Sequence, residues 1–228
     1  MLKSTKKQFT ALFTLIVLLE LITAQVEALE PIHYIAKPAI VGSLIVWVIN
    51  QKSSLNLSDR FLLLSALGFS VTGDILLMFV RLSEWYFISG LVAFLMAHIC
   101  YLILFFKQRN TLNKPYVGIA ILYIYSLVFG YYIYNSLGDM TIPVTGYEIV
   151  ILLMASASLL RKGAVNNVSY KHVAIGAVFF LISDSILALN KFHSPIPLSG
   201  IWIMITYALA QYFIVMGILR SKTVTSVT

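Results

Sequence analysis

Two aspartates stand inside stretches of sequence that are otherwise apolar enough to cross a membrane. Asp74 lies in LGFSVTGDILLM, residues 67–78, and Asp184 lies in GAVFFLISDSILAL, residues 176–189. Both acids follow the same local pattern: a small residue, Asp, any residue, Ile or Leu, and Leu. An ionised carboxylate in hydrocarbon costs at least a few kcal/mol, so an acid in this position is a functional-site hypothesis in itself. We expect these two carboxyl groups to carry the chemistry of the chain.

The composition places the chain among integral membrane proteins. Hydrophobic residues make up 60% of it and charged residues 11%, with a mean hydropathy of +0.90, whereas soluble domains carry about 25% charged residues. With 228 residues, the chain has room for roughly eight spans of about 20 residues and little else. Its activity must therefore take place in or at the bilayer.

Eight apolar runs predict an all-α fold, a polytopic membrane bundle of eight transmembrane helices that forms a single domain over residues 1–228. The runs lie at about 9–24, 33–50, 61–80, 85–106, 116–134, 143–160, 172–190 and 198–219. A basic start followed by the run 9–24 is also typical of a signal peptide, but Glu20 within the run favours a helix that is retained.

The basic residues predict the orientation of the bundle. With a cytoplasmic N-terminus and eight spans, only Arg81 and Lys191 fall in outside connections. The inside segments hold Lys3, Lys6, Lys7, Lys52, Arg60, Lys107, Arg109, Lys114, Arg161, Lys162, Lys171, Arg220 and Lys222. This asymmetry predicts that both termini are cytoplasmic, and it explains the net charge of +7 without a nucleic-acid partner. A compact chain with no targeting tail favours a bacterial inner membrane.

Polar side chains within the runs are predicted to gather at one depth. Five of them fall in the outer half of their helices, and His98 and Gln211 lie nearer the middle; the five are Glu20, Lys37, Asp74, Glu148 and Asp184. Since isolated charges in a membrane must be paired or hydrated, this pattern indicates a polar cavity that opens to the non-cytoplasmic side.

A faint internal match suggests a parallel repeat of four helices plus four. Asp74 is followed by His98 and Asp184 by Gln211, 24 and 27 residues later, and each of these later residues ends the frame aromatic, two residues, Ala, polar. Two halves of equal orientation would place their sites near the interface between them.

Each polar residue also has a structural interpretation. The aspartates could form an ion pair with Lys37 or carry coupling protons, and Lys37 could reach the headgroup region by snorkelling. His98 and Gln211 could be interhelical hydrogen-bond partners. Glu20 and Glu148 lie near helix ends, where hydration is cheap. Glycine-rich phosphate loops, GxSxG and HExxH are absent, and the 4 histidines are scattered, so we expect no metal and no cofactor.

An ordered set of short motifs runs through five of the predicted helices. They are Lys37-Pro38; Gly73-Asp74-Ile75-Leu76-Leu77; Phe87-Ile88-Ser89-Gly90-Leu91 with Phe94, Ala97-His98 and Tyr101; Gly176-Ala177 with Phe180, Ser183-Asp184 and Leu187-Ala188; and Tyr207 with Ala210-Gln211. Together they resemble the YhhN family, the eight-helix membrane proteins that include the animal lysoplasmalogenases. The resemblance extends from about residue 37 to residue 214.

The resemblance implies hydrolysis of the vinyl ether bond of a lysoplasmalogen, which releases a fatty aldehyde and glycerophosphoethanolamine or glycerophosphocholine. Protonation of the alkenyl carbon gives an oxocarbenium ion that water captures, so the reaction needs one protonated acid and one carboxylate. Two acids in one cavity of low dielectric constant divide into these two forms, as in glycosidases. We expect Asp74 and Asp184 to be catalytic, in an order left open. Lys37, His98, Gln211, Ser183 and Tyr207 would bind the lysophospholipid or support the acids.

Other classes of protein fit the same residues. A proton-coupled transporter of small amphiphiles would use the same buried acids. Such transporters often have interrupted helices at corresponding positions of their two repeats, and the sequence shows no obvious interruption of this kind. A lipid-binding membrane protein without chemistry would need neither acid to titrate. An ester or amide lipid hydrolase would need a nucleophile motif that the sequence lacks. Turnover separates an enzyme from the others, and uptake into proteoliposomes separates a carrier from a binding protein.

Overall fold

The computed structural model describes residues 5–51, 55–112 and 114–221, and within these ranges it contains eight α-helices and no strand. The all-α class is therefore confirmed for the described residues. The helices are α1 (Lys6–Thr23), α2 (Glu30–Asn50), α3 (Leu57–Met78), α4 (Glu84–Lys107), α5 (Tyr116–Ile133), α6 (Thr141–Leu160), α7 (Asn167–Ala188) and α8 (Ser199–Ile218). Every helix overlaps its predicted run.

Polar caps explain why two helices begin before their apolar runs. The side chain of Asn56 accepts a hydrogen bond from the backbone N–H of Asp59 and starts α3. Asn166 does the same for Ser169 and starts α7. Asn is among the strongest N-cap residues because its side-chain oxygen satisfies a free N–H group of the first turn. A polar first turn thus precedes each membrane-spanning stretch, and hydropathy alone misses it.

Seven helices, α2 to α8, are long and apolar enough to cross a membrane. The first helix, α1, is not among them, because its 18 residues include Lys6, Lys7 and Glu20. The chain is thus a polytopic membrane protein, and the predicted eighth span is not confirmed. Large apolar side chains point outward along the bundle, most densely on α5, where Val117, Leu127 and others are exposed, as expected for a surface in contact with lipid.

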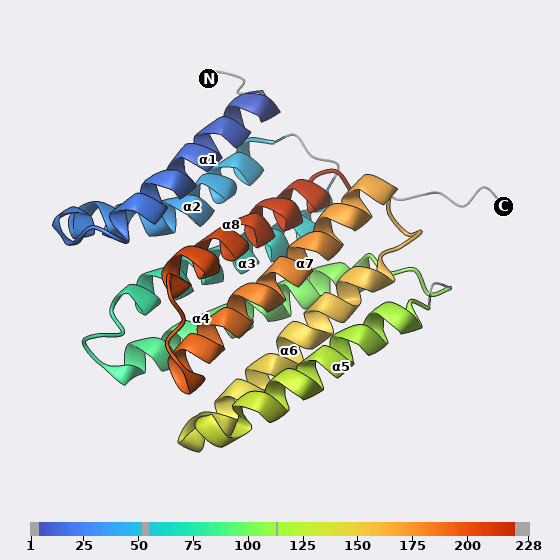
Figure 1. Cartoon of the computed structure of the whole chain (residues 1–228). Coiled ribbons are helices and arrows are strands. Elements are labelled where there is room, and N and C mark those ends of the chain that lie inside the picture. The colour runs from blue at the N-terminus through green and yellow to red at the C-terminus, as the bar shows by residue number, and fades with distance from the viewer. Residues whose placement is uncertain (1–4, 52–54, 113, 222–228) are drawn as a thin grey trace.

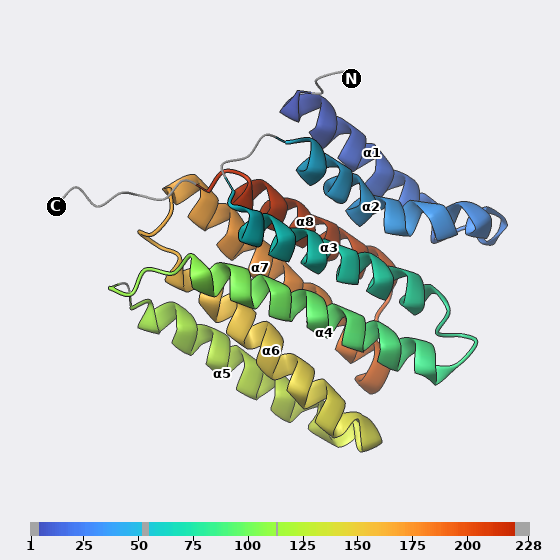
Figure 2. The same ribbon diagram turned by 180° about the vertical axis from the view of Figure 1, so that it is seen from behind.

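Helices that follow one another in the chain run roughly antiparallel, with α1 and α2 at one side of the bundle and α5 and α6 at the other (Figures 1 and 2). Between them lie the pairs α3 with α4 and α7 with α8, and α4 also packs on α6. The beginning of α1 and the end of α8 lie at the same end of the bundle (Figure 1). The predicted repeat of four helices plus four stays a prediction.

Glycines allow the two central helix pairs to approach closely. A Cβ atom on Gly73 would lie 2.6 Å from the ring of Phe94, and one on Gly176 would lie 2.9 Å from the carbonyl oxygen of Ala210. Small residues at such contacts let helix backbones pack in a membrane. Gly73 and Gly176 therefore allow close packing within each helix pair.

The end of the bundle where α1 begins and α8 ends is tied together by charged and amide groups. Lys107 donates to Asp59 at 2.6 Å, and the buried Arg161 donates to Gln108 Oε1 at 2.8 Å and to Ser169 Oγ at 2.9 Å. Burial lowers the pKa of Arg161, and the negative charge of Asp59 opposes this shift. Three of the basic residues used for the orientation, Lys3, Lys52 and Lys222, lie outside the described residues.

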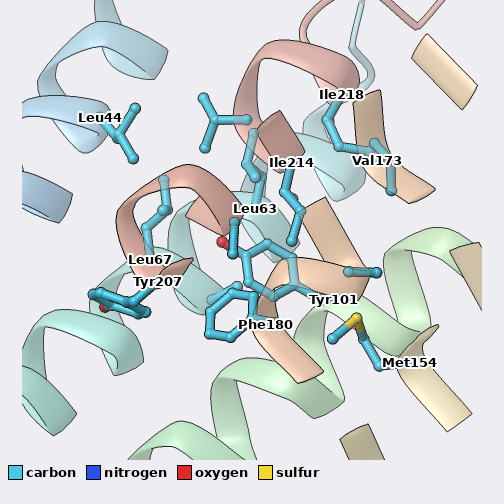
Figure 3. Close-up of a cluster of buried hydrophobic side chains, with 14 of the residues drawn as sticks. Leu44, Leu63, Leu67, Tyr101, Met154, Val173, Phe180, Tyr207, Ile214 and Ile218 are labelled. Atoms are coloured by element: carbon cyan, nitrogen blue, oxygen red, sulfur yellow. The ribbon is translucent and has the colours of Figure 1, made fainter. Parts of the chain in front are cut away.

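One cluster of buried apolar side chains draws on all eight helices. Figure 3 shows its centre, where Tyr101, Phe180 and Tyr207 lie together among aliphatic side chains such as Leu63, Leu67 and Ile214. The ring centroids of Phe180 and Tyr207 are 5.6 Å apart. Buried tyrosines need a partner for their hydroxyl groups. Tyr101 and Tyr207 therefore connect the apolar core to polar side chains, Gln211 and Asp74 respectively.

Candidate active site

Asp74 on α3 lies in a hydrogen-bond network that joins three helices. Tyr207 Oη on α8 donates to Asp74 Oδ2 at 2.8 Å. One turn further along α8, Gln211 donates to Ser70 Oγ at 2.9 Å and accepts from Tyr101 Oη at 2.6 Å. Only 2% of the surface of Asp74 is exposed. The carboxyl group is therefore enclosed by side chains that satisfy one another, an arrangement that makes each member costly to remove.

Asp184 on α7 has fewer partners. Tyr147 Oη on α6 donates to Asp184 Oδ2 at 2.5 Å. His98 Nε2 on α4 lies 3.9 Å from the same oxygen, beyond a direct hydrogen bond. His98 is fully buried, and neither of its ring nitrogens has a hydrogen-bond partner among the described residues. The side chain of Asp184 keeps 18% exposure, so this carboxyl group is accessible where Asp74 is not.

The accessible surface of Asp184 faces a small apolar cavity between α4, α5, α6 and α7. Its volume is about 60 Å³, and Tyr147 and Glu148 also line it. Apart from Ser185 and Tyr125, the remaining walls are apolar, among them Leu77, Phe87, Leu91, Phe94, Phe129, Leu181 and Phe192. A cavity of this size has room for water, whereas a lipid chain needs the aromatic walls to move apart.

A layer of aromatic rings separates the two aspartates. Tyr207, the partner of Asp74, contacts Phe94 and Phe180, with centroid distances of 5.7 and 5.6 Å. Phe180 in turn lies 4.7 Å from the ring of His98. Phe94 lines the cavity, and Asp74 does not. The expectation that both acids share one polar cavity therefore differs from the structure, because Asp184 lines this cavity and Asp74 does not.

Each aspartate lies beside the polar residue of the other half of the chain. Asp74 belongs to the network of Gln211, and Asp184 lies next to His98. The spacing along the sequence had associated Asp74 with His98 and Asp184 with Gln211. The halves of the chain thus interleave at the candidate site.

A second, larger space opens at the end of the bundle where α1 ends and α2 begins. It has a volume of about 710 Å³ and lies between the connection from α1 to α2 and the connection from α3 to α4. We call it the vestibule. Its charged and titratable lining residues are Glu27, Glu30, His33, Lys37 and Arg81. Leu77 lines both the vestibule and the cavity, so this side chain lies between them.

The other residues considered from the sequence are distributed around these spaces. Ser183 Oγ donates to the carbonyl of Ile203 at 3.1 Å and ties α7 to α8. Glu20 is fully buried, with Oε2 3.0 Å from His33 Nδ1. Within the described part of the chain, no group of three or more His, Cys, Asp or Glu side chains is placed to hold a metal ion.

Sequence reasoning missed one residue of the cavity and left another without a role. Tyr147 was not considered, although it donates a hydrogen bond to Asp184. Glu148 was placed among the polar residues of the predicted cavity but was given no role; it lines the cavity and accepts from Ser126 Oγ at 2.7 Å. Both lie on a helix without a family motif. A useful signal was present in Tyr147-Glu148 itself, a polar pair in the apolar run 143–160.

The helical bundle, with carboxyl groups between its apolar helices, places the chain in the class of polytopic α-helical membrane proteins. A family model described as the YhhN family matches residues 32–218, and the chain belongs to this family. It is similar to a lysoplasmalogenase of Homo sapiens, 34% identical over 161 residues, which are 68% of this chain and 64% of that protein. It is also similar to a lysoplasmalogenase of Mycobacterium tuberculosis, 30% identical over 164 residues, 70% of this chain and 60% of that protein.

A lysoplasmalogenase of Bos taurus is 30% identical over 159 residues, again 68% of this chain and 64% of that protein. The chain thus matches less than two thirds of the length of these relatives. No solved structure matches it.

Proposed function

We propose that the protein hydrolyses the vinyl ether bond of lysoplasmalogens within the membrane, yielding a fatty aldehyde and a glycerophospho-ethanolamine or glycerophosphocholine. Family membership and the names of its relatives support this substrate class. The observation that carries the proposal is the carboxyl group of Asp184 at the wall of an apolar cavity, held by Tyr147. An acid beside an apolar space is suited to protonating a carbon atom of a lipid chain.

In the proposed mechanism, Asp184 gives its proton to the alkenyl carbon that does not carry oxygen. The double bond supplies the electron pair for the new C–H bond, and the neighbouring carbon and the ether oxygen become an oxocarbenium ion. Water adds to that carbon and loses a proton to a carboxylate. The resulting hemiacetal then breaks its C–O bond to the glycerol, which leaves as an alcohol, and the aldehyde remains.

The second carboxyl group of this mechanism is Asp74 in our proposal. Its burial and its hydrogen bond from Tyr207 fix its position, and the pair Phe94 and Leu77 would have to move for it to meet the substrate. Glu148 is the competing candidate, because it lines the same cavity as Asp184. His98 and Gln211 would orient water or the two tyrosines that donate to the aspartates. Ser183 would hold α7 beside α8.

The proposal is tested by incubating the purified protein with an alkenyl lysophosphoethanolamine and with its alkyl ether and acyl ester counterparts. We expect aldehyde from the alkenyl lipid and no product from the other two, because only the vinyl ether can be protonated to an oxocarbenium ion. Product from the acyl ester, or from none of the three, would contradict the proposal. Uptake of labelled lysolipid into proteoliposomes without turnover would favour the transporter.

We further propose that α1 also crosses the membrane, which gives eight spans in one domain, both termini in the cytoplasm and, in bacteria, residence in the inner membrane. The shared end of α1 and α8 supports this topology (Figure 1), as does the excess of basic residues expected there. Labelling of single cysteines placed at Thr5 and at Arg81, with a reagent that does not cross membranes, tests it. Only the second should react in intact cells.

A further inference from the structure

We propose that the vestibule binds the headgroup of the substrate and that it selects zwitterionic headgroups, in which a phosphodiester is joined to an ammonium group. This inference rests on the proposed function and deepens it. The vestibule combines a large open volume, about 710 Å³, with two positive and two negative side chains in its lining.

The positive pole consists of Lys37 on α2 and Arg81 in the connection from α3 to α4. Neither side chain has a hydrogen bond or an ion pair within 4 Å among the described residues. At this end of the bundle the sequence offers few other cations, and the nearest alternative, Lys191, lies over the ring of Phe87 at 5.0 Å. The positive charge of Lys37 also acts on the buried carboxyl groups of Glu20 and Asp74. Two cations that line an open space and make no direct hydrogen bond are suited to a phosphate group.

The negative pole consists of Glu27 and Glu30, on the opposite connection from Arg81. Glu30 accepts a hydrogen bond from Tyr34 Oη at 2.9 Å, and Tyr34 stacks on Phe79, with ring centroids 5.6 Å apart. Carboxylates beside aromatic rings favour an ammonium group by charge, hydrogen bonding and cation–π attraction. An anionic headgroup such as phosphoglycerol would meet the same carboxylates without a compensating charge.

A buried and incompletely paired acid supports the floor of the vestibule. Glu20 is fully buried, and its Oε2 atom lies 3.0 Å from His33 Nδ1, a lining residue. Its other oxygen, Oε1, has no hydrogen-bond partner among the described residues. A buried polar atom without a partner is costly unless something else satisfies it. A polar oxygen that the described residues leave without a hydrogen-bond partner thus lies behind His33, in the wall of the vestibule.

The vestibule is also in the right place to align the substrate. Leu77 lines both the vestibule and the cavity, and Asp74 lies three residues before Leu77, on the same face of α3. In a lysoplasmalogen only the glycerol backbone separates the phosphate from the vinyl ether. A headgroup held by Lys37 and Arg81 would thus bring the vinyl ether to Leu77, at the boundary between the vestibule and the cavity that Asp184 lines.

The test measures binding of alkyl ether lysolipids, which have no vinyl ether to hydrolyse, by calorimetry in detergent. The headgroups are phosphoethanolamine, phosphoglycerol and none, the last being an alkylglycerol. We expect phosphoethanolamine to bind at least about tenfold more tightly than the other two. Lys37→Met and Arg81→Gln should each weaken it about tenfold, and Glu30→Gln should weaken phosphoethanolamine while leaving phosphoglycerol unchanged or tighter. Inorganic phosphate should compete weakly.

Lys191→Met is the matched control, because it removes a cation at the same end of the bundle outside the vestibule. The affinity of this variant for the phosphoethanolamine lysolipid should equal that of the parent. A loss in Lys191→Met as large as that in Arg81→Gln, or equal binding of the alkylglycerol, would overturn the inference. Arg81 and Glu30 are exposed, so these variants should keep the parent's thermal unfolding.

This binding experiment separates the two proposals. Selective binding that is lost in the vestibule variants, with no aldehyde from the alkenyl lipid, would uphold the headgroup site and reject the enzymatic function. Aldehyde release by the parent, with unchanged binding in Lys37→Met and Arg81→Gln, would uphold the enzyme and reject the headgroup site.

Discussion

Asp74 and Asp184 share a local sequence pattern, and the protein gives them opposite surroundings. Asp74 is 2% exposed and belongs to a closed network of Tyr207 and Gln211, whereas the side chain of Asp184 is 18% exposed and faces a cavity. In both cases a tyrosine from another helix donates to the carboxyl group. The shared pattern sets the acid on its helix, and the neighbouring helices decide what the acid can reach.

This comparison suggests a division of labour. The accessible Asp184 lines the cavity, so a ligand that enters the cavity can reach its carboxyl group. The enclosed Asp74 is 2% exposed and accepts a hydrogen bond from Tyr207 on α8. It therefore meets a substrate only after a rearrangement, or it acts on the fold. The variants below separate these cases.

The largest difference is expected between the two candidates for the second carboxyl group. If Asp74 fills this role, Asp74→Asn lowers the rate of aldehyde release by about 10²–10⁴-fold, the range for general acid–base groups, and Glu148→Gln keeps most of the parent rate. The reverse result would transfer the role to Glu148. Steady-state rates of both variants, each checked by size-exclusion chromatography, decide between them.

Removing the hydroxyl group of each donor tyrosine tests how completely each aspartate is enclosed. Tyr207→Phe leaves the buried Asp74 without its donor, so we expect it to lower the free energy of unfolding by about 1–3 kcal/mol. Tyr147→Phe should cost less, because water in the cavity can hydrogen-bond Asp184 in its place. Thermal unfolding in detergent measures both. Equal losses would mean that the two carboxyl groups are equally enclosed.

The glycines beside the two acids should differ in a similar way. Gly176→Ala forces a Cβ atom to 2.9 Å from the backbone oxygen of Ala210, whereas the contact at Gly73 is with the side chain of Phe94, which can move. We expect Gly176→Ala to lower the free energy of unfolding by about 1–3 kcal/mol and Gly73→Ala to cost less. Gly68→Ala is the control on α3, with open space around its Cβ position. A larger loss at Gly73 than at Gly176 would contradict this order.

The smallest effect is expected at Ser183. Its hydroxyl group donates to one backbone carbonyl, of Ile203, and that carbonyl also accepts from Thr206 Oγ1. Ser183→Ala should therefore lower the free energy of unfolding by no more than about 1 kcal/mol and leave activity near the parent level. A loss of activity by orders of magnitude would instead show that Ser183 contacts the substrate.

Much of the fold could be predicted from the sequence, because hydropathy and charge identify membrane helices almost alone. The apolar runs located all eight helices, the patterns around Asp74 and Asp184 singled out both acids, and the ordered motifs on five helices indicated the family. The starts of α3 and α7 were missed because Asn56 and Asn166 cap polar turns.

The candidate site was less predictable. Depth along each helix suggested that the polar residues meet in one cavity, but depth does not say which side of a helix faces which neighbour. The rings of Phe94 and Phe180, which separate Asp74 from Asp184, look like ordinary core residues in the sequence. Partners from other helices, such as Tyr147 for Asp184, depend on the packing of the whole bundle.

The most direct test of this account is aldehyde release by Asp184→Asn, measured beside the parent protein. The amide keeps an oxygen that can accept from Tyr147, so we expect unchanged thermal unfolding, but it has no proton to give to the alkenyl carbon. We predict a rate at least about 10²-fold below that of the parent. A folded Asp184→Asn protein that releases aldehyde at the parent rate would contradict the assignment of Asp184 as the acid.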